Sequence, residues 1–308
     1  TIEQVYRLAR ALAGDEPLRT LNAAVLTRAQ VESVVEVLIA ARADGTTGSL
    51  PDLDPKRSDI ILAGALVLEG VVRRFGIDEM LLSEYALREG VFLDTIARRR
   101  GGSLPHLRDV ARRSALDLMA ACDEDPVHSE HVAALALELF DATADRHGLG
   151  PDERALLEAA ALLANAGLAI SHNKHHKHSY YVIRNSDRLV GFTDQEIEVV
   201  AQIARYHRKS APKASHPEWA ALDEDDQRTV LVGAAVLRVA IGLDRSHHQA
   251  VTGLGVAEED GALVISVRTE DPDADLSLEL YAAAERSGLL ADVLALPIRV
   301  ARAVPAAR

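Results

Sequence analysis

Cysteine and long apolar runs are scarce in this sequence of 308 residues. Its single cysteine, Cys122, excludes a disulfide framework and suits a reducing compartment. No apolar run reaches the ~18 residues that a membrane-spanning helix needs. The segment from Thr1 to Gln4 is polar and lacks the basic start of a signal peptide. We therefore expect a cytoplasmic protein with no membrane partner.

Aromatic residues are also few, at 4% of the chain, whereas hydrophobic residues in total make up 48%. The core must then be built from alanine and branched aliphatic side chains, which favours packed helices. The formal net charge, 34 − 47 = −13, argues against a nucleic-acid partner. The length predicts two or three domains.

One basic stretch interrupts this acidic chain. Between His172 and Lys213 there are eight Lys and Arg residues against four Asp and Glu, together with five of the twelve histidines. Such a stretch favours an anionic ligand bound at one place, and a solvated basic face is the alternative interpretation.

The first hundred residues predict alternating helix and strand. Helical patterns cover 29–43 and 60–75, and Ser58 or Asp59 is expected to cap the second of these helices. The segment Met80–Leu87 predicts a strand that leads into a further helix, an α/β feature. The basic, glycine-rich segment Arg98–Ser103 is the expected linker.

The remainder predicts a helical region and then a change of period. Residues 106–250 are helical almost throughout, whereas 262–267 and 275–280 predict strands and 281–287 a helix. We expect three domains, over residues 1–100, 105–250 and 251–308.

Five segments, in this order and spacing, resemble the Ppx/GppA phosphatase family, which includes exopolyphosphatases and guanosine pentaphosphate phosphohydrolases. The segments are Arg57–Ala65, Leu87–Gly90, Ser171–Tyr180 with Arg184–Asp187, Tyr206–Lys209 and Gly242–His247. The most specific of them is Ser171–Tyr180, which is rich in His and Lys and is followed by the Arg-Asn-Ser-Asp sequence.

The resemblance implies an α+β, predominantly helical fold. It implies part of an actin-like (ribonuclease H-like) α/β lobe, then an HD-like all-α domain, then a small α+β C-terminal domain. The activity implied for the intact parent is hydrolysis of terminal phosphoanhydride bonds of inorganic polyphosphate or guanosine pentaphosphate. It further implies magnesium in the intact parent and a homodimer.

The same resemblance places the catalytic carboxylate in an N-terminal lobe for which this chain offers no candidate segment. Thr1 is then a remnant of the second phosphate loop, and we expect no catalytic residue here. Phosphoryl transfer needs a base, a positioned water and cations on the phosphate oxygens. We therefore expect this chain to supply the polyphosphate-binding and dimerisation part, and to be inactive alone.

The helical middle resembles an HD metal site that has lost its ligands. His128 matches the first ligand, whereas Ala164 and Asn165 stand at the His-Asp pair and Ile241 at the last Asp. Since Ala and Ile cannot bind a metal ion and Asn is a poor substitute for carboxylate, we predict no metal or other cofactor in this chain. His128 is expected to be buried or capping.

A second histidine cluster comprises His172, His175, His176 and His178. Clustered imidazoles can bind zinc or nickel, but Lys174 and Lys177 lie among them, and their charges favour an anion. A plain structural loop is the third alternative.

We predict that eight residues of the basic stretch and of the fifth motif contact a phosphate chain, since such a ligand needs several cations along a groove. They are Lys174, His175, His178, Arg205, His207, Arg208, Lys209 and Arg245. Two other functions stay open: a stand-alone polyanion-binding or dimerisation module, and an HD-type metal phosphohydrolase with ligands at other positions.

Overall fold

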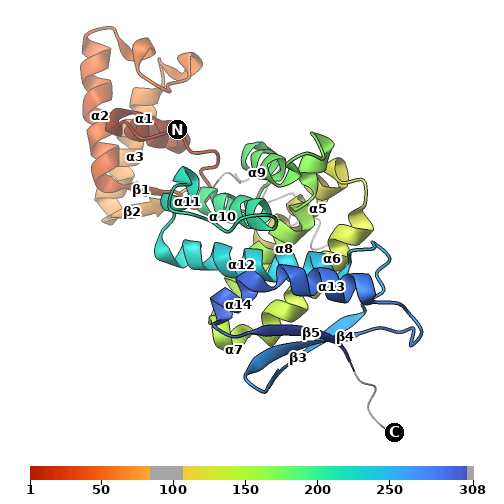
Figure 1. The fold of residues 1–308 in the computed structure, drawn as a ribbon. Helices are drawn as coiled ribbons and strands as arrows, with labels where there is room; N and C mark the ends of the chain where they lie inside the picture. Colours follow the sequence, from red (N-terminus) through yellow and green to blue (C-terminus); the bar gives the residue numbers. More distant parts are fainter. Residues whose placement is uncertain (84–106, 304–308) are drawn as a thin grey trace, which may run out of the picture. The chain divides into compact units, whose positions relative to one another are not determined.

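The computed structural model describes residues 1–83 and 107–303 and divides the chain into two compact units, Thr1–Pro105 and His106–Arg308 (Figure 1). In its described part the first unit holds three α-helices, two short 3₁₀ helices and a two-stranded antiparallel sheet, β1-β2. Its elements are α1 (Ile2–Ala13), β1 (Val25–Thr27), α2 (Arg28–Ala43), η1 (Thr47–Ser49), η2 (Pro55–Arg57), α3 (Ile61–Phe75) and β2 (Glu79–Leu81).

The helices of the first unit follow from local sequence signals. α1 buries Val5 and Leu8 on one face and ends at Gly14, whose φ of 78° lies in the left-handed region. α2 begins with a capping box in which Thr27 and Gln30 each accept a hydrogen bond from the other's backbone. These helices and α3 enclose a core of aliphatic side chains.

Two details of the first unit differ from the sequence prediction. Neither Ser58 nor Asp59 caps α3: the N-cap is Ile60, which makes no capping bond, and the hydroxyl of Ser58 donates to the carbonyl of Pro55 instead. The hydroxyl of Ser58 is thus used in a local 3₁₀ turn and does not cap α3. The strand predicted over Met80–Leu87 is present as Glu79–Leu81. Leu82 and Ser83 follow it outside any strand, and residues 84–87, like the expected linker, lie outside the described residues.

The described part of the second unit is mostly helical and ends in a three-stranded sheet. Its elements are α5 (Leu107–Cys122), α6 (Pro126–Ala142), α7 (Ala144–His147), α8 (Pro151–Leu163), η3 (Ala166–Ala169), α9 (His175–Asn185), α10 (Asp194–Tyr206), α11 (Pro217–Ala220), α12 (Glu224–Leu243), β3 (Gly253–Glu259), β4 (Ala262–Arg268), α13 (Ser277–Arg286), α14 (Gly288–Leu294) and β5 (Ile298–Arg302). The predicted predominantly helical α+β fold class is confirmed.

Helix α12 is the centre of the second unit, and α6, α10 and α13 pack around it (Figure 1). Its N-terminus is capped by Asp223, which accepts a bond from the backbone of Asp226. Near its other end the backbone of Ala283 approaches Gly242 so closely that a Cβ there would lie 2.6 Å from the Cα of Ala283. The position therefore requires glycine.

The C-terminal sheet has the order β3-β4-β5, with β3 antiparallel and β5 parallel to β4. The buried apolar side chains of this sheet and of the helices form one hydrophobic core. The strand predicted over 275–280 is wrong: Ser277 begins α13, and only Asp275 and Leu276 of the predicted strand precede the helix. No helix in the ranges 1–83 and 107–303 is long and apolar enough to cross a membrane.

Candidate functional site

Helices α9 and α10 are antiparallel neighbours that bring the two halves of the basic stretch together. α10 starts with a capping box between Thr193 and Glu196. Arg184, near the end of α9, is ion-paired with Asp194 at 3.1 Å and with Glu198 at 2.6 Å, which fixes the pairing of the helices. The start of α9 consequently lies beside the end of α10.

The histidine loop and the helix end meet through their side chains. Nε2 of His175 lies 3.3 Å from Nε2 of His207, and the two rings stack with their centroids 5.3 Å apart. Nη1 of Arg208 lies 3.3 Å from Nδ1 of His175. Segments about thirty residues apart in the sequence thus form a single surface.

The inner histidines of this surface are neutral at pH 7. Burial is the main cause that lowers the pKa of His207 to about 3, with the neighbouring His175 and His176 acting in the same direction. Burial likewise lowers the pKa of His176 to about 4. The permanent positive charge here therefore comes from Lys and Arg.

Arg205 is a predicted contact residue whose charge is already compensated. Its guanidinium is ion-paired with Glu218 at 3.1 Å and lies over the rings of Tyr180 and Tyr206, at 5.1 and 5.5 Å from their centroids. These contacts give Arg205 a structural role.

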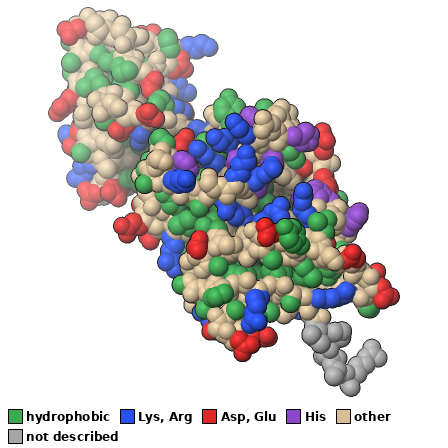
Figure 2. All heavy atoms as spheres, in the orientation of Figure 1, with side chains coloured by type: hydrophobic (Ala, Val, Ile, Leu, Met, Phe, Trp, Pro, Cys, Tyr) green, Lys and Arg blue, Asp and Glu red, His purple; other side chains and the backbone are tan. Residues whose placement is uncertain are grey.

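Several other cations have no carboxylate within ion-pair distance among the described residues. They are Lys174, Lys177, Arg208, Lys209, Lys213, Arg245 and Arg286. Figure 2 shows Lys, Arg and His side chains gathered on one face of the second unit, over α9, α10 and α11. Lys174 and Lys209 both have positive φ, 58° and 67°, a conformation that non-glycine residues adopt mainly where the surrounding structure enforces it. His178 is half-buried in the first turn of α9.

Arg286 is a member of this surface that sequence reasoning missed. After burial, the main causes that lower its pKa are the charges of Arg245 and Arg208, so the three guanidinium groups lie within electrostatic reach of one another. Arg286 ends α13, and the last turn of a helix favours a cation. We name Lys174, Arg208, Lys209, Arg245 and Arg286 the cationic surface.

A pocket of about 90 Å³, open to solvent, lies between the start of α9 and the end of α10. Its lining combines two unpaired cations with histidine, hydroxyl and aromatic groups. The lining residues are His176, Lys177, Arg205, Tyr206, Arg208, Ser210 and His216.

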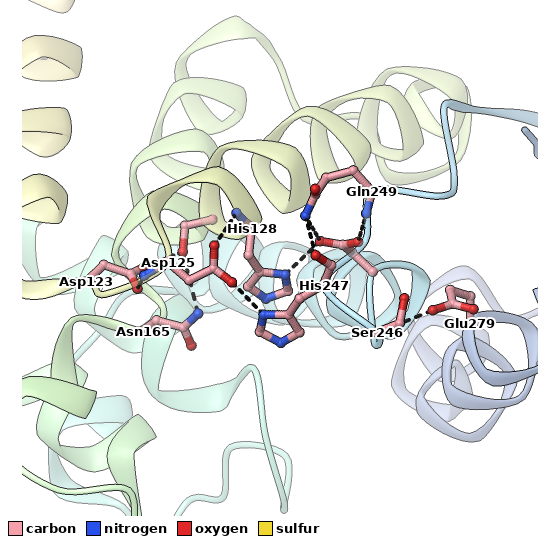
Figure 3. A network of polar contacts seen from close by, with 10 residues as sticks. Asp123, Asp125, His128, Asn165, Ser246, His247, Gln249 and Glu279 are labelled. Carbon is pink, nitrogen blue, oxygen red and sulfur yellow. Dashed lines mark hydrogen bonds and ion pairs between the residues drawn. The ribbon is translucent and has the colours of Figure 1, made fainter. Parts of the chain in front are cut away.

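A separate buried polar network surrounds His128 (Figure 3). Nδ1 of His128 donates to the Oδ2 of Asp244 at 2.7 Å, and these residues are only 3% and 1% exposed. The ring of His128 stacks on that of His247 at 3.7 Å, and His247 bonds to Asp125 at 2.8 Å. Although burial alone raises the pKa of Asp244, the bonds from His128 and from the backbone of Gln249 hold it below its usual value.

His128 is buried, as predicted. Its acidic partner, Asp244, directly follows the last residue of α12, Leu243. Asn165 lies nearby, with its Nδ2 3.5 Å from Oγ of Ser129. Within the part of the chain that the structure describes, no group of three or more His, Cys, Asp or Glu is placed to hold a metal ion.

Thr1, the predicted phosphate-loop remnant, belongs to the first unit. It is exposed at the start of α1, its side chain makes no capping bond, and it lies against Gly64, where a Cβ would meet its Cγ2 at 2.6 Å. The Leu87–Gly90 motif lies outside the described residues.

Comparison with known families agrees with these motifs. A model described as Ppx/GppA phosphatase, domain III, matches residues 110–277, and one described as Ppx/GppA phosphatase family matches residues 4–99. The chain belongs to the Ppx/GppA phosphatase family.

Several curated relatives are described as guanosine-5'-triphosphate,3'-diphosphate pyrophosphatase. The protein from Pseudoalteromonas translucida is 28% identical over 165 residues, which are 53% of this chain and 32% of that protein. The protein from Photobacterium profundum is 28% identical over 224 residues, 70% of this chain and 43% of that protein. The chain thus spans between about a third and about two fifths of the relatives it matches.

Proposed function

We propose that this chain supplies the phosphate-chain-binding part of a Ppx/GppA-type phosphohydrolase. The whole protein would hydrolyse terminal phosphoanhydride bonds of inorganic polyphosphate or of guanosine pentaphosphate, the nucleotide in the relatives' description. The observation that carries the proposal is the contact of the histidine loop with the helix end through His175, His207 and Arg208.

The electrostatics of the surface support a flexible polyanion as ligand. The five cations of the cationic surface come from four separate segments and have no carboxylate partner among the described residues. A phosphate chain carries about one charge per phosphate and gains affinity by contacting several cations in turn. Arg groups offer bidentate contacts, and Lys groups act as movable point charges.

The remaining parts of the proposal come from the family resemblance. They are an actin-like segment in the first unit, an HD-like arrangement of helices in the second, a small α+β domain over residues 251–308 and a homodimer. We also propose that the 308-residue chain binds its ligand without hydrolysing it, since no catalytic carboxylate is identified in it. Magnesium in the intact parent is likewise a part of the proposal that comes from this resemblance.

The experiment is a calorimetric titration of the chain with long-chain and short-chain polyphosphate. The double variant Arg208→Ala/Lys209→Ala should weaken long-chain binding more than short-chain binding, because only the long chain spans the surface. The matched control, Arg112→Ala/Arg113→Ala, removes the same charge from α5, where both arginines are ion-paired. Equal losses for both ligands, or for both variants, would count against the proposal.

A further inference from the structure

The pocket between α9 and α10 contains a buried polar atom without a partner. His176 is only 5% exposed, it lines the pocket, and its Nδ1 has no hydrogen-bond partner in the described part of the chain. Buried polar atoms are nearly always bonded, so an orphan atom beside a pocket indicates a group that binds there.

The other lining residues define the charge of that group. Lys177 and Arg208 bring positive charge with no carboxylate partner among the described residues, and Ser210 adds a hydroxyl. Two carboxylates lie near the pocket: Glu218 is ion-paired with Arg205, and Glu198 with Arg184. At about 90 Å³ the pocket is smaller than the sites of drug-sized ligands, which suits one phosphoryl group rather than a nucleoside.

We propose that this pocket is a discrete site for one tetrahedral oxyanion, a phosphoryl group, and that His176 takes up a proton when the site fills. The inference deepens the proposed function and rests on it where the phosphoryl group is the end of a bound chain; free inorganic phosphate is the other source. His176, Lys177, Ser210 and His216 are not among the eight residues predicted from the sequence.

The charges around His176 explain the coupling. Three elements bring titratable groups to His176. α9 contributes His175 and Lys177, and α11 with its N-cap contributes Glu218 and His216. α10 and the turn after it contribute Arg205, His207, Arg208 and Lys209, whereas η3 carries no titratable group. Burial first, and then the charges of His175, Lys209, Arg208 and Lys177, lower the pKa of His176 to about 4 and keep the empty site unprotonated. A bound dianion reverses this balance because it favours the imidazolium, which then donates a charge-assisted hydrogen bond.

Proton uptake has a defined sign. The pKa of His176 is low in the empty site and higher in the filled one, so affinity must rise as pH falls toward the pKa of the empty site. If the filled-site pKa returns to about 6.5, binding is about tenfold tighter at pH 5.5 than at pH 7.5. Sulfate is the suitable probe, because it remains a dianion across this range.

The test is calorimetry of the full chain with sulfate at both pH values, in buffers of different ionisation enthalpy that report proton uptake. The wild type should gain about tenfold in affinity and take up nearly one proton at pH 5.5. His176→Gln should lose most of that gain, whereas His172→Gln, at an exposed position outside the lining, should keep it. The ¹⁵N resonances of the His176 ring in the wild type provide a readout that needs no variant, and they should move to the imidazolium range on titration.

Two results overturn the proposal: the same pH dependence in His176→Gln as in the wild type, or ring resonances that do not respond to sulfate. Parallel titrations with inorganic phosphate and long-chain polyphosphate separate the two sources of the phosphoryl group. If long-chain polyphosphate binds without any response of His176, the pocket proposal is wrong and the cationic-surface proposal stands. If His176 responds to sulfate but long-chain polyphosphate does not bind, the proposed function is wrong and the pocket proposal stands.

Discussion

Asp244 and His128 form a buried hydrogen bond of 2.7 Å that connects the turn after α12 to the first turn of α6. The same turn carries Arg245 of the cationic surface, and Glu279 accepts a bond from the backbone of Ser246 at 3.1 Å. These two bonds hold in place the turn that carries Arg245.

Replacing His128 should destabilise the second unit strongly. His128→Ala leaves the Asp244 carboxylate buried without its partner, at a cost of about 3–5 kcal/mol in the free energy of unfolding. The control is His247→Asn, which removes an exposed ion pair with Asp125 and tolerates the φ of 60° at that position. It should cost less than about 1 kcal/mol. Urea unfolding at pH 7 measures both, and similar costs would contradict the structural role of the buried pair.

The buried His207 predicts a pH dependence of stability. Its pKa is about 3 in the folded chain and about 6.5 when unfolded, so below pH 6.5 the unfolded state binds the proton that the folded state excludes. Stability should be fully present above pH 6.5 and fall by up to about 1.4 kcal/mol per pH unit down to pH 3. His207→Gln should flatten the slope measured by urea unfolding between pH 7 and pH 5. An unchanged slope would place the acid sensitivity elsewhere.

Gly242 should be intolerant of any side chain. A Cβ there would lie 2.6 Å from a backbone atom of Ala283, so Gly242→Ala must separate α12 from α13, at about 1–3 kcal/mol. Gly288→Ala is the control, because a Cβ at that position has nothing within 4 Å. Thermal unfolding should show a lower Tm for the first variant and no comparable fall for the second.

Arg205 and Arg208 should contribute unequally to binding. Arg208→Ala removes an uncompensated charge and should weaken long-chain polyphosphate binding by about tenfold or more, the scale of one charge-assisted hydrogen bond. Arg205→Ala removes a cation that is already paired with Glu218. The loss of affinity for long-chain polyphosphate should therefore be smaller than in Arg208→Ala. Glu218→Gln should raise affinity. A larger loss in Arg205→Ala than in Arg208→Ala would contradict this division of roles.

The sequence predicted the elements whose signals are local. The helices predicted over residues 29–43 and 60–75 and the strand predicted over 262–267 are present as α2, α3 and β4. The region 275–280 was misassigned because six residues of alternation fit a strand or the start of a helix equally well, and Ser277 begins a helix there.

Tertiary contacts explain what sequence reasoning missed at the site. Arg286 joins Arg208 and Arg245 only because α13 packs on α12, and no local pattern around it carries that information. The bond between Asp244 and His128 depends on where α12 ends. The compensation of Arg205 by Glu218 likewise depends on the placement of α11.

The measurement that tests the central claim most directly is the salt dependence of long-chain polyphosphate binding. If one continuous surface holds the ligand, the slope of log Kd against log salt should reach several units in the wild type. Lys174→Ala/Lys177→Ala, Arg208→Ala/Lys209→Ala and Arg245→Ala/Arg286→Ala should each lower it by about one to two. Arg112→Ala/Arg113→Ala should leave it unchanged. A shared cationic surface would be contradicted if only one of these three double variants lowered the slope. It would also be contradicted if all three had the same slope as the control variant.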